Sequence, residues 1–262
     1  MEILVCIKQV PGTAEVKIDE KTGVLKRDGV ESKMNPYDLY AVETALKIKE
    51  SNGAKVNVIS MGPPQAAEII KEAFMMGVDG GVLLTDRKFA GADVLATAYT
   101  LSQGVKRFGS PDLIICGKMT TDGDTAQVGP ELAEFLGMPH ATNVLKIDKI
   151  RESSIVVECD MIDAVEVLEL QYPCLISVDK GIYQPRLPSF RLKLATNDRD
   201  IPCIGLDDLE DKNESSYGLT GSPTQVKRVF PPTENNSREM WEGTGNELAN
   251  LLFNKLKELK FL

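Results

Sequence analysis

A buried strand, a polar turn and the start of a helix follow one another in Asp112-Leu113-Ile114-Ile115-Cys116-Gly117-Lys118-Met119-Thr120-Thr121-Asp122-Gly123-Asp124-Thr125-Ala126-Gln127-Val128-Gly129-Pro130. A chain that leaves a strand in this way directs backbone N–H groups beyond the edge of the sheet, where the helix dipole favours anions. Asp124 is the predicted N-cap of the helix, with Gln127 at the spacing of a capping box. The segment alone is consistent with a capped helix or with a turn that binds a ligand.

Strand and helix patterns alternate through the first half of the chain. Predicted strands cover residues 3–7, 55–60, 82–84 and 112–116, and predicted helices cover residues 63–76, 93–108 and 125–136, with another helix beginning at Asn35-Pro36. In that helix Asn35 is the predicted cap and Pro36 occupies the first helical position. Apolar strands that alternate with helices predict a doubly wound, mostly parallel sheet of the nucleotide-binding, Rossmann-like α/β class, covered on both faces.

The pattern changes at residue 144. Four short apolar runs, residues 144–147, 155–159, 165–170 and 174–178, predict an antiparallel extension of the sheet. An irregular polar region follows, and amphipathic spacing predicts a closing helix over residues 245–259. We therefore divide the chain into an α/β domain, residues 1–183, and an arm, residues 184–262, that either wraps around a partner or folds back on its own domain.

Composition excludes several classes of function. A net charge of −9 without a cluster of lysine and arginine argues against a nucleic-acid partner. Because no apolar run reaches the roughly 20 residues of a membrane-spanning helix, and Met1 leads directly into a strand pattern, we predict a cytoplasmic protein without membrane insertion. Five scattered cysteines lack metal-ligand spacing. The single histidine, His140, is expected in a loop and excludes histidine-based triads.

A ligand of an open α/β sheet lies beyond the carboxyl ends of the strands, where the strand order reverses. If the first and fourth strands are neighbours, the segments that follow them, residues 6–12 and 117–124, meet at this edge, and residues 60–64 open at the same edge. Glycines in these turns permit close approach of the backbone, and threonine hydroxyls donate to phosphate oxygens. The sequence therefore predicts a nucleotide site at this edge.

The motifs that would identify a reaction are missing. No dinucleotide fingerprint follows the first strand, and no P-loop occurs. Asp122 and Asp124 could bind Mg²⁺, but two carboxylates in a turn more often cap helices or form Asx turns, so no metal site is predicted. A binding site without evident catalytic side chains suits a redox cofactor, which supplies the chemistry itself.

Four motifs occur in order along nearly the full length of the chain: Val5-Cys6-Ile7-Lys8-Gln9-Val10-Pro11; Met34-Asn35-Pro36-Tyr37-Asp38 with Ala41-Val42-Glu43; Asp122-Gly123-Asp124-Thr125-Ala126-Gln127-Val128-Gly129-Pro130; and Gly221-Ser222-Pro223-Thr224-Gln225-Val226. Each motif is weakly specific alone, and the four in this order are highly specific. On these motifs the chain resembles the beta subunit of electron transfer flavoprotein.

The resemblance implies a heterodimer with a larger alpha subunit, in which a mobile FAD domain delivers single electrons to partner enzymes. It also implies an adenine-nucleotide site in this chain, which holds AMP in the housekeeping group of the family and a second FAD in the electron-bifurcating group. Carried over by motif, the cofactor-binding residues are Cys6, Asn35, Pro36, Tyr37, Asp38, Met61, Gly117, Lys118, Met119, Thr120, Thr121, Asp122, Gly123, Asp124, Thr125, Ala126, Gln127 and Val128. They lie at the same edge that the sheet pattern indicates.

The form of residues 122–130, and Gly91-Ala92-Asp93 at the start of the third helix, resemble the bifurcating group. In that group the beta-subunit FAD takes an electron pair from NADH. One electron goes to ferredoxin or flavodoxin, and the other goes through the alpha-subunit FAD to an acyl-CoA or hydroxyacid dehydrogenase. The alternative within the family binds AMP structurally and serves as a one-electron conduit.

Leu187, in Arg186-Leu187-Pro188-Ser189, matches the family leucine that anchors the partner dehydrogenase. A loop leucine packed on its own domain is the ordinary alternative. The chain departs from the family at two places. Residues 193–200 replace a lysine-rich stretch, which is expected to change the dehydrogenase that docks, and Met119-Thr120 stands where the family has a polar residue followed by a small one.

Two other classes of function compete with this interpretation. A nucleotide-sensing regulatory protein of similar fold would lack the C-terminal arm and would purify colourless and without a partner. An ATP-consuming ligase or amidotransferase needs a phosphate loop after the first strand, which Lys8-Gln9-Val10-Pro11-Gly12 does not provide.

Overall fold

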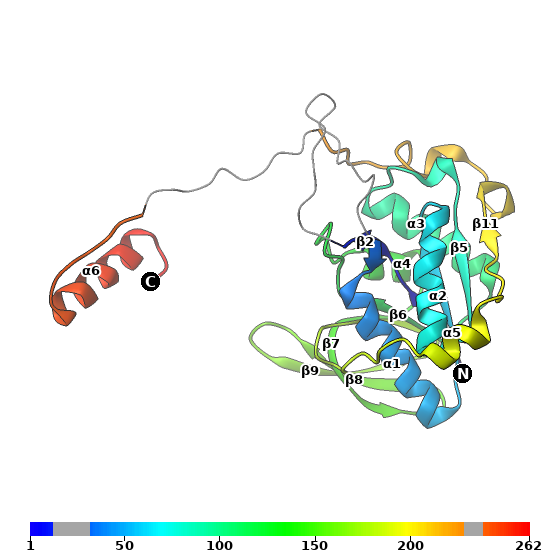
Figure 1. The fold of residues 1–262 in the computed structure, drawn as a ribbon, viewed down its shortest axis with the longest axis horizontal. Helices are drawn as coiled ribbons and strands as arrows, with labels where there is room; N and C mark the ends of the chain where they lie inside the picture. The colour runs from blue at the N-terminus through cyan, green and yellow to red at the C-terminus, as the bar shows by residue number, and fades with distance from the viewer. Residues whose placement is uncertain (13–31, 228–237) are drawn as a thin grey trace. The chain divides into compact units, whose positions relative to one another are not determined.

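A computed structural model describes residues 1–12, 32–227 and 238–262 (Figure 1). The chain divides into two compact units, Met1–Lys227 and Arg228–Leu262. The first unit contains every cofactor-binding residue expected from the sequence, and it also contains Leu187.

A nine-stranded sheet forms the centre of the first unit, in the order β11-β5-β4-β1-β6-β10-β7-β8-β9. Its strands are β1 (Glu2–Cys6), β4 (Lys55–Met61), β5 (Gly80–Leu84), β6 (Leu113–Gly117), β7 (His140–Ile150), β8 (Ser154–Asp160), β9 (Val165–Gln171), β10 (Cys174–Val178) and β11 (Cys203–Ile204). Six neighbouring pairs are parallel, and the pairs β7–β8 and β8–β9 are antiparallel. Two further strands, β2 (Gln9–Pro11) and β3 (Ser32–Met34), form a separate antiparallel pair. The predicted mostly parallel α/β fold is confirmed.

Helices cover both faces of the sheet (Figure 1). They are α1 (Pro36–Asn52), α2 (Ala67–Met76), α3 (Val94–Phe108), α4 (Val128–Leu136) and α5 (Phe190–Thr196), with short 3₁₀ turns η1 (Pro64–Ala66), η2 (Arg87–Phe89), η3 (Leu206–Asp208) and η4 (Glu214–Ser216). One core joins α1 and α2 to strand residues such as Val5 and Val58, and the second joins α3 and α4 to Leu4 and Cys6. Because successive side chains of a strand point to opposite faces, the two helix pairs lie on opposite faces.

The direction and place of β10 differ from the prediction. This strand is parallel to both β6 and β7 and lies between them, whereas the sequence predicted an antiparallel extension. All five of its side chains are buried, as expected for a strand covered on both faces. A short apolar run carries no information on strand direction, which explains the wrong prediction. His140, expected in a loop, is the first residue of β7.

The start of α4 also differs from the prediction. This helix begins at Val128 with Gln127 as its N-cap residue, rather than at Thr125 with Asp124 as the cap. Asp124 and Ala126 instead adopt φ angles of 49° and 55°, which are outside the right-handed helical region. The capping-box spacing therefore indicated a nearby helix but missed three turn residues before it.

The other predicted helices of this unit are close to those observed. Asp93 caps α3 by accepting a hydrogen bond from the Ala96 N–H at 3.1 Å. The helix expected over residues 63–76 is divided into the 3₁₀ turn η1 and α2, which ends at Gly77 in a left-handed conformation. Pro36 is the first residue of α1 as predicted, but the side chain of Asn35 makes no capping hydrogen bond.

The second unit contains α6 (Gly245–Glu258), which confirms the predicted closing helix. Thr244 and Glu247 form a capping box at its start, and Lys255 pairs with Glu239 at 2.8 Å. Leu251, Leu252 and Phe253 are exposed on this unit. Across the described parts of the chain, no helix is both long enough and apolar enough to span a bilayer.

Candidate functional site

The carboxyl ends of β4, β1 and β6 lie side by side. β1 is hydrogen-bonded to β4 on one side and to β6 on the other, and the register places Cys6 between Ile59 and Cys116. The strand order reverses at β1, because β4 and β5 continue the sheet in one direction and β6 and β10 in the other. The predicted adjacency of the first and fourth strands is therefore confirmed.

Asn35 joins the start of α1 to the loop after β6. Its side chain is fully buried. The amide nitrogen donates to the Met119 backbone oxygen and to the Asp38 carboxylate, both at 2.9 Å, and the amide oxygen accepts from the Thr121 N–H at 3.2 Å. The Asn35 backbone N–H donates to the Lys8 oxygen at 2.9 Å. One residue thus fixes the loops after β1 and β6 relative to each other.

Asp38 is a buried carboxylic acid in the first turn of α1, with 5% of its surface exposed. Its two oxygens accept hydrogen bonds from the Lys8 backbone N–H at 2.7 Å and from Asn35 at 2.9 Å. Burial raises the pKa of Asp38 to about 7, and these hydrogen bonds only partly oppose the effect. A carboxyl group of this kind can hold or release a proton near neutral pH.

We expect Asp38 to make the free energy of unfolding fall as pH rises from about 4 to about 7. The pKa in the unfolded chain is near 3.8 and in the folded protein about 7, so the folded state binds more protons in this window. The slope from this one group approaches about 1.4 kcal/mol per pH unit. Urea unfolding at several pH values measures it. Asp38→Asn should flatten the dependence and the exposed Asp163→Asn should not; an unchanged slope in Asp38→Asn would contradict this assignment.

Lys8 and Asp122 form a second connection between the same two loops. The Lys8 ammonium contacts both carboxylate oxygens of Asp122, at 2.8 and 2.9 Å. Burial acts to raise the pKa of Asp122, but the hydrogen bond and charge of Lys8 outweigh it, so the net pKa is lowered. Lys8 was not among the expected site residues, although it lies within the first motif, residues 5–11.

Lys118 brings the end of β10 into the site. Its ammonium lies 2.7 Å from the Asp179 carboxylate, and its backbone N–H donates to the Val178 oxygen at 2.9 Å. Asp179 follows β10 directly and is buried. Asp179 is absent from the predicted site residues, because the sequence pattern places residues 174–178 in an antiparallel extension. A parallel β10 would have placed the residue after it at this edge.

Gly117 permits the start of α1 to pack directly on the end of β6. A Cβ atom at this position would lie 2.5 Å from the Asp38 carboxylate and 2.7 Å from the Tyr37 carbonyl carbon. Both distances are shorter than any ordinary contact, and one of them involves backbone. Pro36 and Tyr37 are themselves half-buried at this contact.

Residues 121–127 form an exposed turn at the edge of the sheet. The Asp124 N–H donates to the Thr120 oxygen at 2.9 Å, and Asp124 and Ala126 both have positive φ. A left-handed conformation costs a residue other than glycine roughly 1–2 kcal/mol. Such strain clusters at ligand-binding sites. The threonine hydroxyls and backbone N–H groups of this turn suit phosphate and ribose groups.

The remaining expected residues share this edge with fewer direct connections. Cys6 is buried at the end of β1, and Met61 is half-buried at the end of β4. The Gln9 side chain donates to the Gln65 oxygen at 3.3 Å, which connects the loops after β1 and β4. Direct hydrogen bonds thus bring together residues 35–38 and the loop after β6, whereas Met61 is placed by the sheet.

The fourth motif, residues 221–226, packs against the start of α3. The Asp93 carboxylate accepts hydrogen bonds from the Thr224 N–H at 2.9 Å and from its hydroxyl at 2.7 Å. The Asp93 N–H donates to the Ser222 hydroxyl at 2.8 Å. This motif therefore anchors the last segment of the first unit, and sequence spacing could not show that Asp93 is its partner.

The donor set of the edge fits a nucleotide. The exposed turn carries the hydroxyls of Thr121 and Thr125. The ammonium groups of Lys8 and Lys118 lie at the same edge, paired with Asp122 and Asp179. The Ser60 hydroxyl, one residue before Met61, is buried with no hydrogen-bond partner among the described residues. In the same described ranges, no group of three or more His, Cys, Asp or Glu side chains is placed to hold a metal ion.

Comparison with known proteins finds similarity along the chain. A family model described as "Electron transfer flavoprotein domain" matches residues 22–202. The chain is 46% identical over 260 residues to the caffeyl-CoA reductase-Etf complex subunit CarD of Acetobacterium woodii, covering 98% of both chains. It is 45% identical over 258 residues to an electron transfer flavoprotein subunit beta of Thermoanaerobacterium thermosaccharolyticum, again covering 98% of both. It is 39% identical over 267 residues to the protein FixA of Sinorhizobium fredii, covering 97% of this chain and 94% of that protein.

Proposed function

The chain belongs to the beta-subunit family of electron transfer flavoprotein, and on this premise we propose that its sheet-edge site binds FAD and that its heterodimer with an alpha subunit bifurcates electrons from NADH. Oxidation of NADH to NAD⁺ releases two electrons and one proton. One electron passes to a low-potential carrier, ferredoxin or flavodoxin. The other would pass by way of the alpha-subunit FAD to a flavin-dependent dehydrogenase. Because that dehydrogenase needs an electron pair to reduce its substrate, the reaction balances with two NADH oxidised and two carriers each reduced by one electron.

The observation that carries this proposal is the hydrogen-bonded network at the switch point of the sheet. Asn35 and Lys8 connect the start of α1, the loop after β1 and the loop after β6 in one fixed arrangement. These are the segments that hold nucleotides in sheets of this kind. They are also the segments that carry the family motifs.

Each part of the network has its own task in binding. Residues 121–127 donate hydrogen bonds to the phosphate and ribose groups, and the Asp122 and Asp124 carboxylates accept from ribose hydroxyls. Gly117 lets α1 approach, and Asn35 keeps the loop in place. When bound, FAD supplies the electron-transfer chemistry. Asp38, whose pKa burial raises to about 7, can hold a proton at this edge of the sheet.

The choice of FAD over AMP rests on the form of two motifs. Residues 122–130 and Gly91-Ala92-Asp93 resemble the bifurcating group of the family. The relative from Acetobacterium woodii is named as a subunit of a caffeyl-CoA reductase complex, so that protein works with a reductase. We extend the same arrangement to this chain, with an acyl-CoA or hydroxyacid dehydrogenase as the partner.

Leu187 is the proposed anchor for that dehydrogenase. Its side chain is 87% exposed, which favours a docking role over packing on its own domain. An exposed apolar side chain can anchor an interface when it fills a desolvated pocket of the partner. We assign α6, with its exposed leucine and phenylalanine side chains, to the contact with the alpha subunit.

The cofactor content of the purified heterodimer tests the function. We expect two FAD and no AMP per heterodimer, measured by absorbance and chromatography after denaturation, together with NADH-dependent reduction of ferredoxin or flavodoxin only when the dehydrogenase substrate is present. Asn35→Ala should remove one FAD and leave the alpha-subunit FAD, which places the second flavin in this chain. One FAD and one AMP in the unaltered heterodimer would instead indicate a one-electron conduit.

A further inference from the structure

A buried carboxylate on α1 holds the chain immediately before Leu187. Glu43 is 2% exposed and accepts three hydrogen bonds from Arg186. The Arg186 Nε and Nη2 atoms donate to the two Glu43 oxygens at 2.8 and 2.9 Å, and the Arg186 backbone N–H donates to Glu43 Oε2 at 3.1 Å. The Arg186 Nη1 atom lies 2.7 Å from the carboxylate of Glu50, which is about two turns further along the same face of α1.

The ion pair between Glu43 and Arg186 contributes more to the geometry of the loop than to the stability of the fold. A buried ion pair is often no more stabilising than apolar side chains of the same volume, because both charges lose their hydration. Two-point contacts between arginine and a carboxylate do fix geometry, since the planar guanidinium fits in one orientation. Glu43 also holds the backbone of Arg186, so it determines where the next residue points.

The chain is held again just after Leu187. The Ser189 N–H donates to the Met75 oxygen at the end of α2 at 2.8 Å, and the Ser189 hydroxyl caps α5 by accepting from the Leu192 N–H at 3.4 Å. Leu187 therefore stands between two fixed points. Phe190 follows on α5 and is 73% exposed. Two large apolar side chains are thus held in water on a fixed backbone.

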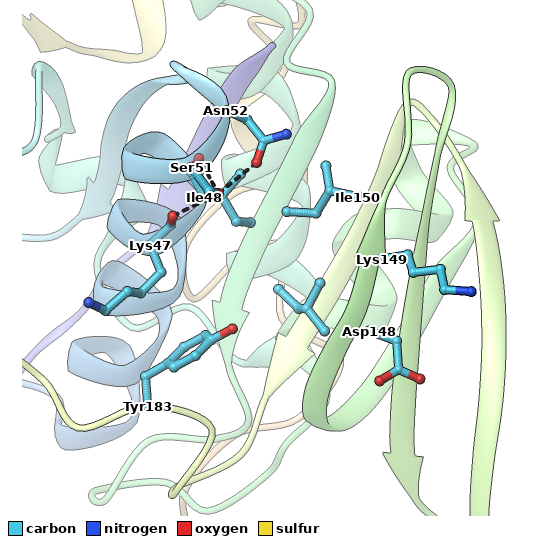
Figure 2. A pocket seen from close by; sticks show the side chains of 9 residues that line it. Lys47, Ile48, Ser51, Asn52, Asp148, Lys149, Ile150 and Tyr183 are labelled. Carbon is cyan, nitrogen blue, oxygen red and sulfur yellow. Dashed lines mark hydrogen bonds between the residues drawn. The ribbon is translucent and has the colours of Figure 1, made fainter.

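A hollow lies beside this loop, on the same helix. It has a volume of about 260 Å³ and is bounded by Lys47 and Ser51 of α1, by Asp148 and Lys149 of β7, and by Tyr183 (Figure 2). Figure 2 shows α1 on one wall, β7 on the other, and Tyr183 between them at one end. Tyr183 belongs to the chain segment that leads to Arg186. The hollow therefore borders the start of the segment that leads to Leu187.

We propose that Glu43 is a positioning residue for the docking of the flavin-dependent dehydrogenase: it holds Arg186 so that Leu187 and Phe190 enter an apolar pocket of that partner without a further loss of loop freedom. The inference rests on the proposed role of Leu187 in docking. Holding a loop in its bound shape before contact lowers the entropic cost of association. Glu43 touches neither the partner nor a cofactor, so its effect is confined to the affinity for the dehydrogenase.

The experiment compares heterodimers that carry Glu43→Gln, Arg186→Lys, Leu187→Ala or the exposed control Glu68→Gln. The probe is the FAD-loaded acyl-CoA dehydrogenase that the unaltered heterodimer reduces fastest. We expect the KM for the heterodimer to rise about tenfold in Glu43→Gln and Arg186→Lys, and about thirtyfold in Leu187→Ala. The kcat and the flavin content should stay unchanged in all four. Amide hydrogen exchange of residues 186–190 should accelerate at least tenfold in Glu43→Gln but not in Glu68→Gln.

The outcomes separate this inference from the proposed function. If Leu187→Ala raises KM while Glu43→Gln alters neither KM nor hydrogen exchange, the positioning role is wrong and docking through Leu187 stands. If exchange accelerates in Glu43→Gln with no change in KM, the contact is purely structural and the inference is also overturned. If Leu187→Ala leaves KM unchanged, the docking part of the proposed function fails, and the inference fails with it.

Discussion

Replacing Gly117 by alanine is expected to lower the free energy of unfolding by about 2–3 kcal/mol and to empty the nucleotide site of this chain. The added Cβ would lie 2.5 Å from the Asp38 carboxylate and 2.7 Å from the Tyr37 carbonyl carbon. The helix backbone cannot move away cheaply, because Asn35 holds the start of α1 to the loop after β6. Relief of the clash therefore displaces the segments that form the site.

Urea unfolding of the purified protein and cofactor analysis of the heterodimer measure these two effects. The matched control is Gly129→Ala, whose Cβ would have its nearest neighbours at 3.6 and 3.7 Å, an ordinary contact distance. Since Gly129 lies inside α4, alanine should be neutral there or stabilise by up to about 1 kcal/mol. Normal cofactor content in Gly117→Ala would show that the contact between α1 and β6 does not govern binding.

Asn35→Ala is expected to lower the free energy of unfolding by about 3 kcal/mol and to raise the dissociation constant of the nucleotide on the order of 100-fold. The change deletes the partner of the Met119 oxygen, the Thr121 N–H and one Asp38 oxygen in a single step. Buried polar groups without partners carry their full desolvation cost. The loop after β6 then loses its connection to α1. Affinity falls because the ligand has to order this loop when it binds, which costs conformational entropy.

The nucleotide is removed from the protein and titrated back in a calorimeter, which measures the change in affinity. Urea unfolding measures the change in stability. The exposed Asn197, which hydrogen-bonds only its neighbour Asp198 among the described residues, provides the control Asn197→Ala. That variant should match the unaltered protein within about 0.5 kcal/mol. An Asn35→Ala protein with unaltered affinity would mean that the ligand itself, and not Asn35, determines the conformation of the loop.

The sequence predicted most of the fold because its elements carry strong local signals. Pro36 and Asp93 mark helix starts, and apolar strands alternate with helices as in parallel sheets. Direction was predictable for β1, β4, β5 and β6, since a helix between two strands requires a parallel crossover. No such signal existed for β10, whose neighbours are set by contacts distant in the sequence.

The place of the candidate site could be predicted from topology, and most of its chemistry could not. Strand ends and glycines pointed to the loop after β6, but the partners of Asn35 depend on three-dimensional contacts between segments far apart in sequence. The same holds for Asp179 and for the pairing of Glu43 with Arg186. The pKa of an ionisable side chain depends on how deeply it is buried. Burial can be predicted from the sequence only where the hydrophobic residues repeat with a regular period.

The position of β10 has a consequence for how the chain comes together during synthesis. β10 separates β6 from β7, although β7, β8 and β9 precede it along the chain. The edge of β6 therefore stays unpaired until residue 178 has left the ribosome. Until then the strands β7, β8 and β9 cannot join the sheet, because β10 is the strand that connects β7 to β6. Such an unpaired edge is a template for wrong pairing with another chain. The nascent protein is thus most vulnerable to aggregation over a defined window of translation, which closes when β10 inserts and joins the two halves of the sheet.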